Sequence, residues 1–190
     1  VSDAWRKRAN ELLISNNYDP KKPYCIIHPG ARKYDQWQYE KFAETAKYFF
    51  NRFDLNIILT CGPGELEQIE KLKKCLKNQI PYTFISTELS LLLAITASAK
   101  FVLCHNGGYM HAASALGVPV AALFGLTDYR IWKPLGEKSM VIHKDIDCWP
   151  CTSKTMKQVC WDGKPECKEL ISVEDVIKSI QQLCPEYLDK

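Results

Sequence analysis

The 190-residue chain has no long hydrophobic run, and no apolar stretch approaches the roughly 20 residues that a membrane span requires. Its first residues, VSDAWRKRANELL, are charged and amphipathic, whereas a secretory signal carries an apolar segment at this place. With neither feature visible, we expect no transmembrane segment and a cytoplasmic location.

The chain also has little net charge, because 25 Lys and Arg residues stand against 22 Asp and Glu residues, for a net charge of +3. No stripe of basic residues alternates with aromatic ones, so nucleic acid is not an expected partner. The composition, 46% hydrophobic and 25% charged, is that of an ordinary globular protein. A chain of this length buries roughly 70% of its unfolded surface in a single core.

The sequence also lacks the glycine motif of proteins that bind nicotinamide cofactors. The first predicted strand is followed by His28–Pro29–Gly30–Ala31, where a dinucleotide-binding chain has G-x-G-x-x-G. Cys61 and Gly62 close the second predicted strand, where such a chain has an acidic residue. An NAD-dependent oxidoreductase is therefore disfavoured.

Short apolar runs alternate with segments of helical periodicity along the chain. Strands are expected at 24–28, 56–61, 82–86, 101–105, 119–124 and 139–143, and helices at 3–15, 39–53, 65–78, 90–99 and 173–183. This alternation predicts an α/β fold, a Rossmann-like, doubly wound parallel sheet of about six strands. Ligands of such folds bind beyond the carboxyl ends of the strands.

The most informative segment is 101–125, FVLCHNGGYMHAASALGVPVAALFG, which has the outline of strand, glycine turn, helix and strand. The turn at Gly107–Gly108 places backbone N–H groups beside the first turn of a helix, where the helix dipole favours an anion such as a phosphate. His111 lies within about one helical turn of the glycines. A glycine pair is also what the geometry of the turn requires by itself, so this segment alone leaves both interpretations open.

Two other predicted loops carry charged residues at the same edge of the sheet. Arg32 and Lys33 follow the first strand and could clamp a diphosphate, although exposed loop cations are often only solvated. Glu65 follows the second strand at the start of a predicted helix. A carboxylate there is favoured by the dipole alone, or it accepts a hydrogen bond from a ribose or sugar hydroxyl.

Four motifs together resemble one known family. HPGA at His28–Ala31, Trp37, GPGE at Gly62–Glu65 and the run Gly107–Gly125 resemble glycosyltransferase family 9, the heptosyltransferases, and in particular their C-terminal donor-binding half. The resemblance extends from about Pro23 to the end of the chain. It implies one half of a GT-B architecture, in an enzyme that transfers a heptose from an ADP-sugar to a lipopolysaccharide core or a related surface glycan.

The resemblance also implies donor-binding roles for ten residues: Arg32, Lys33, Glu65, Asn106, Gly107, Gly108, Tyr109, His111, Thr127 and Asp128. The backbone of 106–109 would hold the diphosphate, Glu65 would lie near the adenosine ribose, and residues 127–128 would form a polar turn beside the nucleotide. Two positions depart from the family pattern. Asn106 replaces an aspartate that engages the donor sugar, and Asp35 replaces a lysine two residues before Trp37.

The expected organisation is an interdomain helix and linker at 1–22 and a nucleotide-sugar-binding domain at 23–190, which includes a Cys-rich loop at 145–168. In GT-B enzymes the acceptor and the general base come from the N-terminal domain. We therefore expect no catalytic residue in this chain, no activity of the chain alone, and no cofactor or metal beyond the donor, ADP-heptose or a related nucleotide sugar.

The full enzyme could associate peripherally with the cytoplasmic face of the bacterial inner membrane. The alternative is a non-catalytic nucleotide-binding or interaction module stapled by cysteines.

The chain has nine cysteines in two groups. Cys25, Cys61, Cys75, Cys104 and Cys184 lie in apolar or helical segments, where cysteine behaves as a small buried hydrophobe. The others, Cys148, Cys151, Cys160 and Cys167, form C-x2-C-x8-C-x6-C in a loop expected to have little regular structure. Zinc, disulfides and free thiols all remain open for this group. We expect it to be structural, not catalytic.

Overall fold

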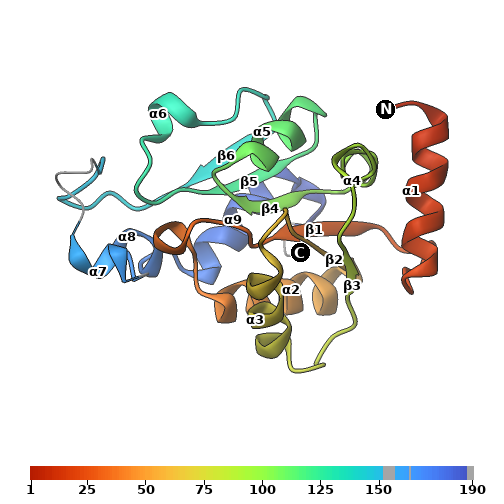
Figure 1. The fold of residues 1–190 in the computed structure, drawn as a ribbon, viewed down its shortest axis with the longest axis horizontal. Coiled ribbons are helices and arrows are strands. Elements are labelled where there is room, and N and C mark those ends of the chain that lie inside the picture. The colour runs from red at the N-terminus through yellow and green to blue at the C-terminus, as the bar shows by residue number, and fades with distance from the viewer. Residues whose placement is uncertain (152–156, 163, 188–190) are drawn as a thin grey trace.

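The computed structural model describes residues 1–151, 157–162 and 164–187. Its centre is a sheet of six parallel strands in the order β3-β2-β1-β4-β5-β6 (Figure 1). The strands are β1 (Tyr24–His28), β2 (Asn56–Thr60), β3 (Thr83–Ile85), β4 (Val102–His105), β5 (Val120–Leu123) and β6 (Ser139–Ile142). The doubly wound Rossmann-like fold predicted from the sequence is confirmed.

The helices are α1 (Asp3–Ser15), α2 (Tyr39–Phe53), α3 (Leu66–Leu76), α4 (Leu89–Thr96), α5 (Gly108–Ala115), α6 (Tyr129–Trp132), α7 (Gln158–Trp161), α8 (Glu166–Glu169) and α9 (Val173–Leu183). Two short 3-10 helices, η1 (Lys33–Asp35) and η2 (Pro185–Tyr187), complete the described elements. No helix among the described residues is long and apolar enough to cross a membrane.

Helices cover both faces of the sheet, because successive side chains of a strand point to opposite faces. Cys25 and Ile27 of β1 lie in one apolar cluster with side chains of α2, α3 and α9, whereas Ile26 lies in a second cluster with side chains of α1, α4 and α5. Ala9 and Leu13 of α1 are buried in that second cluster, and α1 lies beside α4 (Figure 1). The assignment of residues 1–22 to an interdomain linker stays a prediction.

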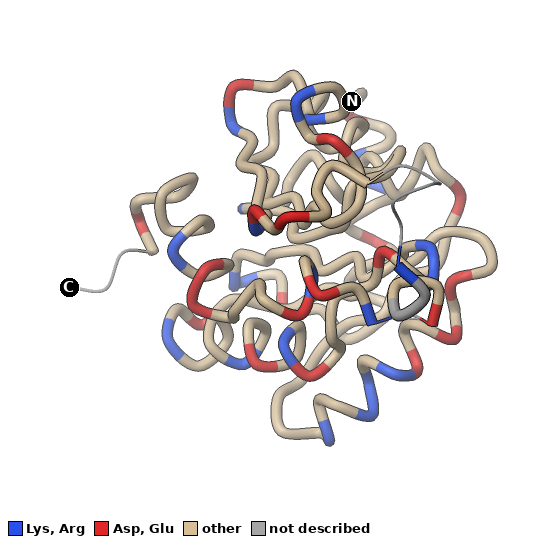
Figure 2. Tube along the Cα trace, turned by 90° about the vertical axis from the view of Figure 1, so that its left-hand side faces the viewer, with Lys and Arg blue, Asp and Glu red and all other residues tan. Residues whose placement is uncertain are grey.

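The strand order reverses between β1 and β4, which are neighbours although two strands separate them along the chain. The loops that follow these two strands leave the sheet toward opposite faces, which makes this point the usual ligand crevice of an open α/β sheet. Figure 2 looks onto this carboxyl edge, where basic and acidic residues are interspersed. The fold therefore directs attention to the loops after β1 and β4, and after their neighbours β2 and β5.

The Cys-rich loop differs from expectation. The prediction of little regular structure is wrong for 158–161 and 166–169, which form α7 and α8, while residues 152–156 and 163 lie outside the described part. Burial explains the order, because Cys160 and Cys167 pack with Leu126 in a small apolar cluster. Burial also raises the pKa of the Cys151 thiol to about 11 and that of the Cys167 thiol to about 12.

All nine cysteines are free thiols in this structure. Over residues 1–151, 157–162 and 164–187, no group of three or more His, Cys, Asp or Glu side chains is arranged to hold a metal ion. Cys160 and Cys167 are buried, whereas Cys148 and Cys151 are half-buried. The structural role expected for these four cysteines stays a prediction.

Candidate functional site

The glycine turn after β4 opens toward solvent. Gly107 has an extended backbone, with φ 176° and ψ −179°, and Gly108 begins α5. Both residues are exposed, and a Cβ atom added to either would meet nothing within 4 Å. Because the first N–H groups of an α-helix have no partner within the helix, the start of α5 presents hydrogen-bond donors and the positive end of its dipole to an open space. This arrangement suits an anion.

Asn106 brings a polar side chain to the same turn. Its backbone N–H donates to the carbonyl of Leu123 at 3.2 Å, which ties the turn to β5. Its Oδ1 is buried and has no hydrogen-bond partner among the described residues. A buried acceptor without a partner costs about 1–3 kcal/mol, so a hydrogen-bond donor that reaches this atom would be stabilised.

His28 and Glu65 join the ends of β1 and β2. The Nδ1 atom of His28 lies 3.0 Å from Oγ1 of Thr60, and its Nε2 atom lies 3.4 Å from Oε2 of Glu65. A carboxylate accepts but does not donate, so Nε2 of His28 is the donor to Glu65, while the direction of the hydrogen bond between Nδ1 and Thr60 depends on the tautomer. The hydrogen bond from His28, followed by that from the N–H of Gly62 at 2.6 Å, lowers the pKa of Glu65 although burial opposes them.

Glycine at two positions makes room for this carboxylate. A Cβ atom at Gly30 would overlap the Glu65 carboxyl group, and one at Gly62 would lie 3.0 Å from Oε2. The backbone of Gly30 is not in the left-handed region. The requirement for glycine at position 30 is therefore one of space, and the carboxylate is clasped between the loops after β1 and β2.

Tyr109 connects α5 to this group. Its ring stacks on the ring of His28 with 4.3 Å between centroids, and its hydroxyl lies 2.8 Å from Oγ1 of Thr96 on α4. The start of α5 is thereby fixed against the end of β1. Glu65 and Tyr109 both contact His28, so three of the predicted loops converge on one histidine.

His105, the last residue of β4, organises the loop after β1. Its Nε2 accepts the backbone N–H of Trp37 at 2.9 Å, which leaves Nδ1 to donate to the carbonyl of Gly30 at 3.3 Å. Burial, and next the positive charge of Lys168, hold its pKa well below the usual range. The ring is therefore neutral, and its role is to fix the course of residues 30–37.

The remaining predicted site residues lie at the same edge. Arg32 and Lys33 are exposed at the start of η1, and His111 is exposed on α5. Thr127 and Asp128 are half-buried between β5 and α6. Asp128 caps α6 by accepting the N–H of Arg130 at 3.0 Å and also binds its guanidinium at 2.6 Å, so its carboxylate is already engaged.

Sequence reasoning placed His28 and His105 at the start of two candidate loops but gave neither residue a role of its own, and it missed Thr60. The available signal was their position, because each is the last residue of a strand that pairs with β1 or is β1 itself. A polar side chain at the carboxyl end of a buried strand points into the edge where ligands of this fold bind. His28 contacts Glu65 and His105 contacts Trp37, and predicting these two contacts requires the strand order.

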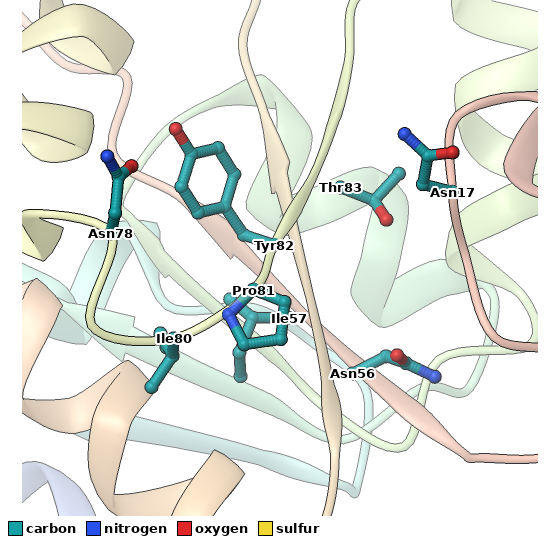
Figure 3. Close-up of a pocket in the computed structure, with 8 residues that line it drawn as sticks. All are labelled: Asn17, Asn56, Ile57, Asn78, Ile80, Pro81, Tyr82 and Thr83. Carbon is teal, nitrogen blue, oxygen red and sulfur yellow. The ribbon is translucent and has the colours of Figure 1, made fainter.

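A cavity of about 460 Å³ lies elsewhere (Figure 3). Asn56 and Thr83, which line it, are the first residues of β2 and β3, so it opens at the amino edge of the sheet. It is thus on the opposite side from the loops described above. The position of the ligand crevice in this class of fold favours the carboxyl edge.

Comparison with known proteins identifies the family to which this chain belongs. The model of glycosyltransferase family 9 (heptosyltransferase) matches residues 2–162, and the chain belongs to this family. The lipopolysaccharide heptosyltransferase 3 of Escherichia coli strain K12 is 28% identical over an alignment of 191 positions, which covers 98% of this chain and 53% of that protein. The lipooligosaccharide heptosyltransferase 2 of Campylobacter jejuni is 26% identical over 183 residues, which cover 93% of this chain and 54% of that protein.

Solved structures give the same fold. The E. coli ADP-heptose lipopolysaccharide heptosyltransferase II matches with a TM-score of 0.80 and 20% identity, over 98% of this chain and 53% of that one. At this identity the likeness shows the fold alone. The chain spans about half the length of the curated relatives it matches.

Proposed function

We propose that this chain is the donor-binding part of a GT-B glycosyltransferase and that its carboxyl edge binds the diphosphate of a nucleotide sugar, ADP-heptose or a close relative. The observation that carries the proposal is the open glycine turn at the head of α5. It lies where the strand order reverses, and no atom of residues 1–151, 157–162 and 164–187 comes within 4 Å of a Cβ added to Gly107 or Gly108. In the same part of the chain, Oδ1 of the adjacent Asn106 has no hydrogen-bond partner.

Each residue then has a defined task. The N–H groups at the start of α5 donate hydrogen bonds to the phosphate oxygens, while Arg32 and Lys33 approach from the loop after β1. Glu65 uses Oε2 to bind Gly62 and His28, and its other oxygen faces a ribose hydroxyl. Asn106 Oδ1 accepts a hydrogen bond from a hydroxyl of the donor sugar.

The chemical contribution of this site is to stabilise the leaving group. When the bond between the sugar and the phosphate breaks, negative charge grows on the diphosphate, and donors already aimed at it lower the barrier. Removing one such donor typically costs about 100- to 1000-fold in rate. The general base and the lipopolysaccharide-type acceptor belong to the other half of the GT-B pair in this proposal. The cytoplasmic location and the peripheral association with the inner membrane stay predictions.

Isothermal titration calorimetry of the protein with ADP, UDP, GDP and NAD tests the proposal, and ADP is expected to bind most tightly. Gly107→Val is a matched probe, because the extended backbone accepts valine, an added Cβ atom meets no described atom within 4 Å, and the side chain would fill the space proposed for the phosphates. We expect this variant to keep its melting temperature and lose ADP binding at least tenfold.

Ala115→Val is the control, because Ala115 is exposed at the other end of the same helix. It should bind ADP as the unaltered protein does. If the unaltered protein binds none of the four nucleotides, or if Gly107→Val binds ADP normally, the proposed site is refuted.

A further inference from the structure

A lysine from the Cys-rich segment is buried at the carboxyl edge of the sheet. Lys168 lies in α8, and its side chain is 1% exposed. Its Nζ donates to the carbonyl of Leu123, the last residue of β5, at 2.8 Å. It also lies 3.6 Å from Oδ1 of Asp35, whose side chain is 2% exposed. Two opposite charges are thus buried together, directly behind the loop after β1.

Such a pair needs an explanation other than stability. Removing two charges from water costs more than their attraction often returns, so apolar residues of similar size commonly hold a fold as well. Burial raises the pKa of Asp35 and lowers that of Lys168, while each partner acts in the opposite direction. No described residue forms a hydrogen bond with Asp35 Oδ1, so the attraction between the two charges holds the pair.

The local backbone is shaped around this pair. A Cβ atom at Gly125, just after β5, would lie 2.6 Å from Cε of Lys168 and 3.2 Å from Oδ1 of Asp35. The loop after β1 and the segment around α8 are also joined by a second contact, because the indole N–H of Trp37 donates to the carbonyl of Ile171 at 3.0 Å. Lys168 therefore has a fixed position relative to this loop.

The other oxygen of Asp35 lies near an exposed cation. Its Oδ2 lies 3.9 Å from Nη2 of Arg32, and the side chain of Arg32 is 63% exposed. The backbone N–H of Asp35 donates to the carbonyl of Arg32 at 2.8 Å. Three charges thus run outward from the core in the order Lys168, Asp35 and Arg32, and the outermost belongs to the loop assigned to the donor diphosphate.

We propose that Lys168 is a positioning residue for donor binding, which neutralises the buried Asp35 and so leaves Arg32 available to the phosphates. This inference rests on the proposed function above. Without Lys168, the nearest cation that can satisfy the buried carboxylate is Arg32, and a guanidinium binds a carboxylate in a paired geometry. Arg32 would then turn inward and leave the crevice. The Cys-rich segment would thus serve the donor site by delivering this lysine.

The test compares the affinity for ADP of Lys168→Met, Arg32→Ala, and the double variant Asp35→Asn/Lys168→Met by calorimetry, with melting temperatures measured in parallel. Lys168→Met should weaken ADP binding about tenfold, as should Arg32→Ala. Lys168→Met combined with Arg32→Ala, as a fourth variant, should weaken ADP binding no more than either change alone, because both remove the same contact. Asp35→Asn/Lys168→Met should instead restore binding to within about twofold of the unaltered protein, since no charge then draws Arg32 inward.

Lys164→Met is the control, because Lys164 is exposed in the same segment. A merely structural role for Lys168 predicts that the ADP affinity of every variant follows its melting temperature, and this result would overturn the inference. Asp35→Asn alone provides an independent check if Lys168→Met fails to fold. It should bind ADP at least as tightly as the unaltered protein, and a tenfold loss would contradict the inference.

The outcomes also separate the two proposals. Normal ADP binding by Lys168→Met, alongside binding by the unaltered protein, would overturn the role of Lys168 and leave the proposed function intact. Failure of the unaltered protein to bind any nucleotide would refute both.

Discussion

A single methyl group at Gly30 should disconnect Glu65 from the site. The backbone at this position lies outside the left-handed region, so alanine is compatible with it, but the added Cβ would overlap the Glu65 carboxyl group. Glu65 would have to swing away and lose the hydrogen bond from Gly62 and the contact with His28. The perturbation of Gly30→Ala is thus confined to one carboxylate.

The expected magnitude follows from the bond that is lost. A hydrogen bond to a charged group contributes about 1.5–3 kcal/mol, and we take the lower end because the Glu65 side chain is 26% exposed. Alanine in place of glycine returns about 0.4–1 kcal/mol by restricting the unfolded chain. The net loss should be about 1 kcal/mol, which lowers the melting temperature by about 2–4 °C in a protein of this size.

A double-mutant cycle with Glu65→Ala provides the assay, with urea unfolding and ADP titration as readouts. Once the carboxyl group is gone, the methyl group at position 30 has nothing to displace. Gly30→Ala should therefore cost nothing further, or stabilise slightly, in the Glu65→Ala background, and ADP affinity should fall equally in all three variants. If Gly30→Ala is equally destabilising with and without Glu65, the proposed dependence of the Glu65 contacts on glycine at position 30 is refuted.

Two further predictions concern histidines. His105 is neutral in the folded protein because its pKa is held well below the usual range, whereas in the unfolded chain it titrates near about 6.5. The contribution of His105 to the free energy of unfolding should therefore be fully present above about pH 6.5 and decrease as the pH falls below it. In urea unfolding at pH 5–7, His105→Gln should reduce the slope of this free energy against pH by up to about 1.4 kcal/mol per pH unit. Identical slopes for the variant and the unaltered protein would contradict the buried neutral ring. His111 is exposed on α5, so His111→Ala should leave the melting temperature unchanged and weaken donor use by the enzyme, and unchanged kinetics would remove His111 from the site.

The fold was predictable because its signals are local. Each strand from β1 to β6 is a short apolar run, and α2 shows its buried face in the spacing of Phe42, Ala46 and Phe49. The glycine turn before α5 was equally visible, since a strand, two glycines and a small-residue helix follow one another directly. Local patterns of this kind need no knowledge of strand order.

The contacts behind the turn were not predictable in this way. His28 meets Glu65 because β1 pairs with β2, and Lys168 meets Asp35 across 133 positions of sequence through a segment without periodicity. Charge gave no signal either, because Asp35 stands in the polar run Arg32–Gln36, and the residue types of this run do not mark it as buried. The ten residues assigned to the donor from the family resemblance stay predictions.

The hydrogen bonds between the loop after β1 and the segment after α8 determine how short the chain can be made without changing this loop. The carbonyl of Ile171 accepts hydrogen bonds from both Trp37 and Lys41, at 3.0 and 2.8 Å. A protein trimmed after β6 would retain the entire sheet, yet the indole of Trp37 would lose its acceptor and its cover. The smallest fragment that keeps residues 32–41 in shape therefore extends at least to Ile171, well beyond the last strand.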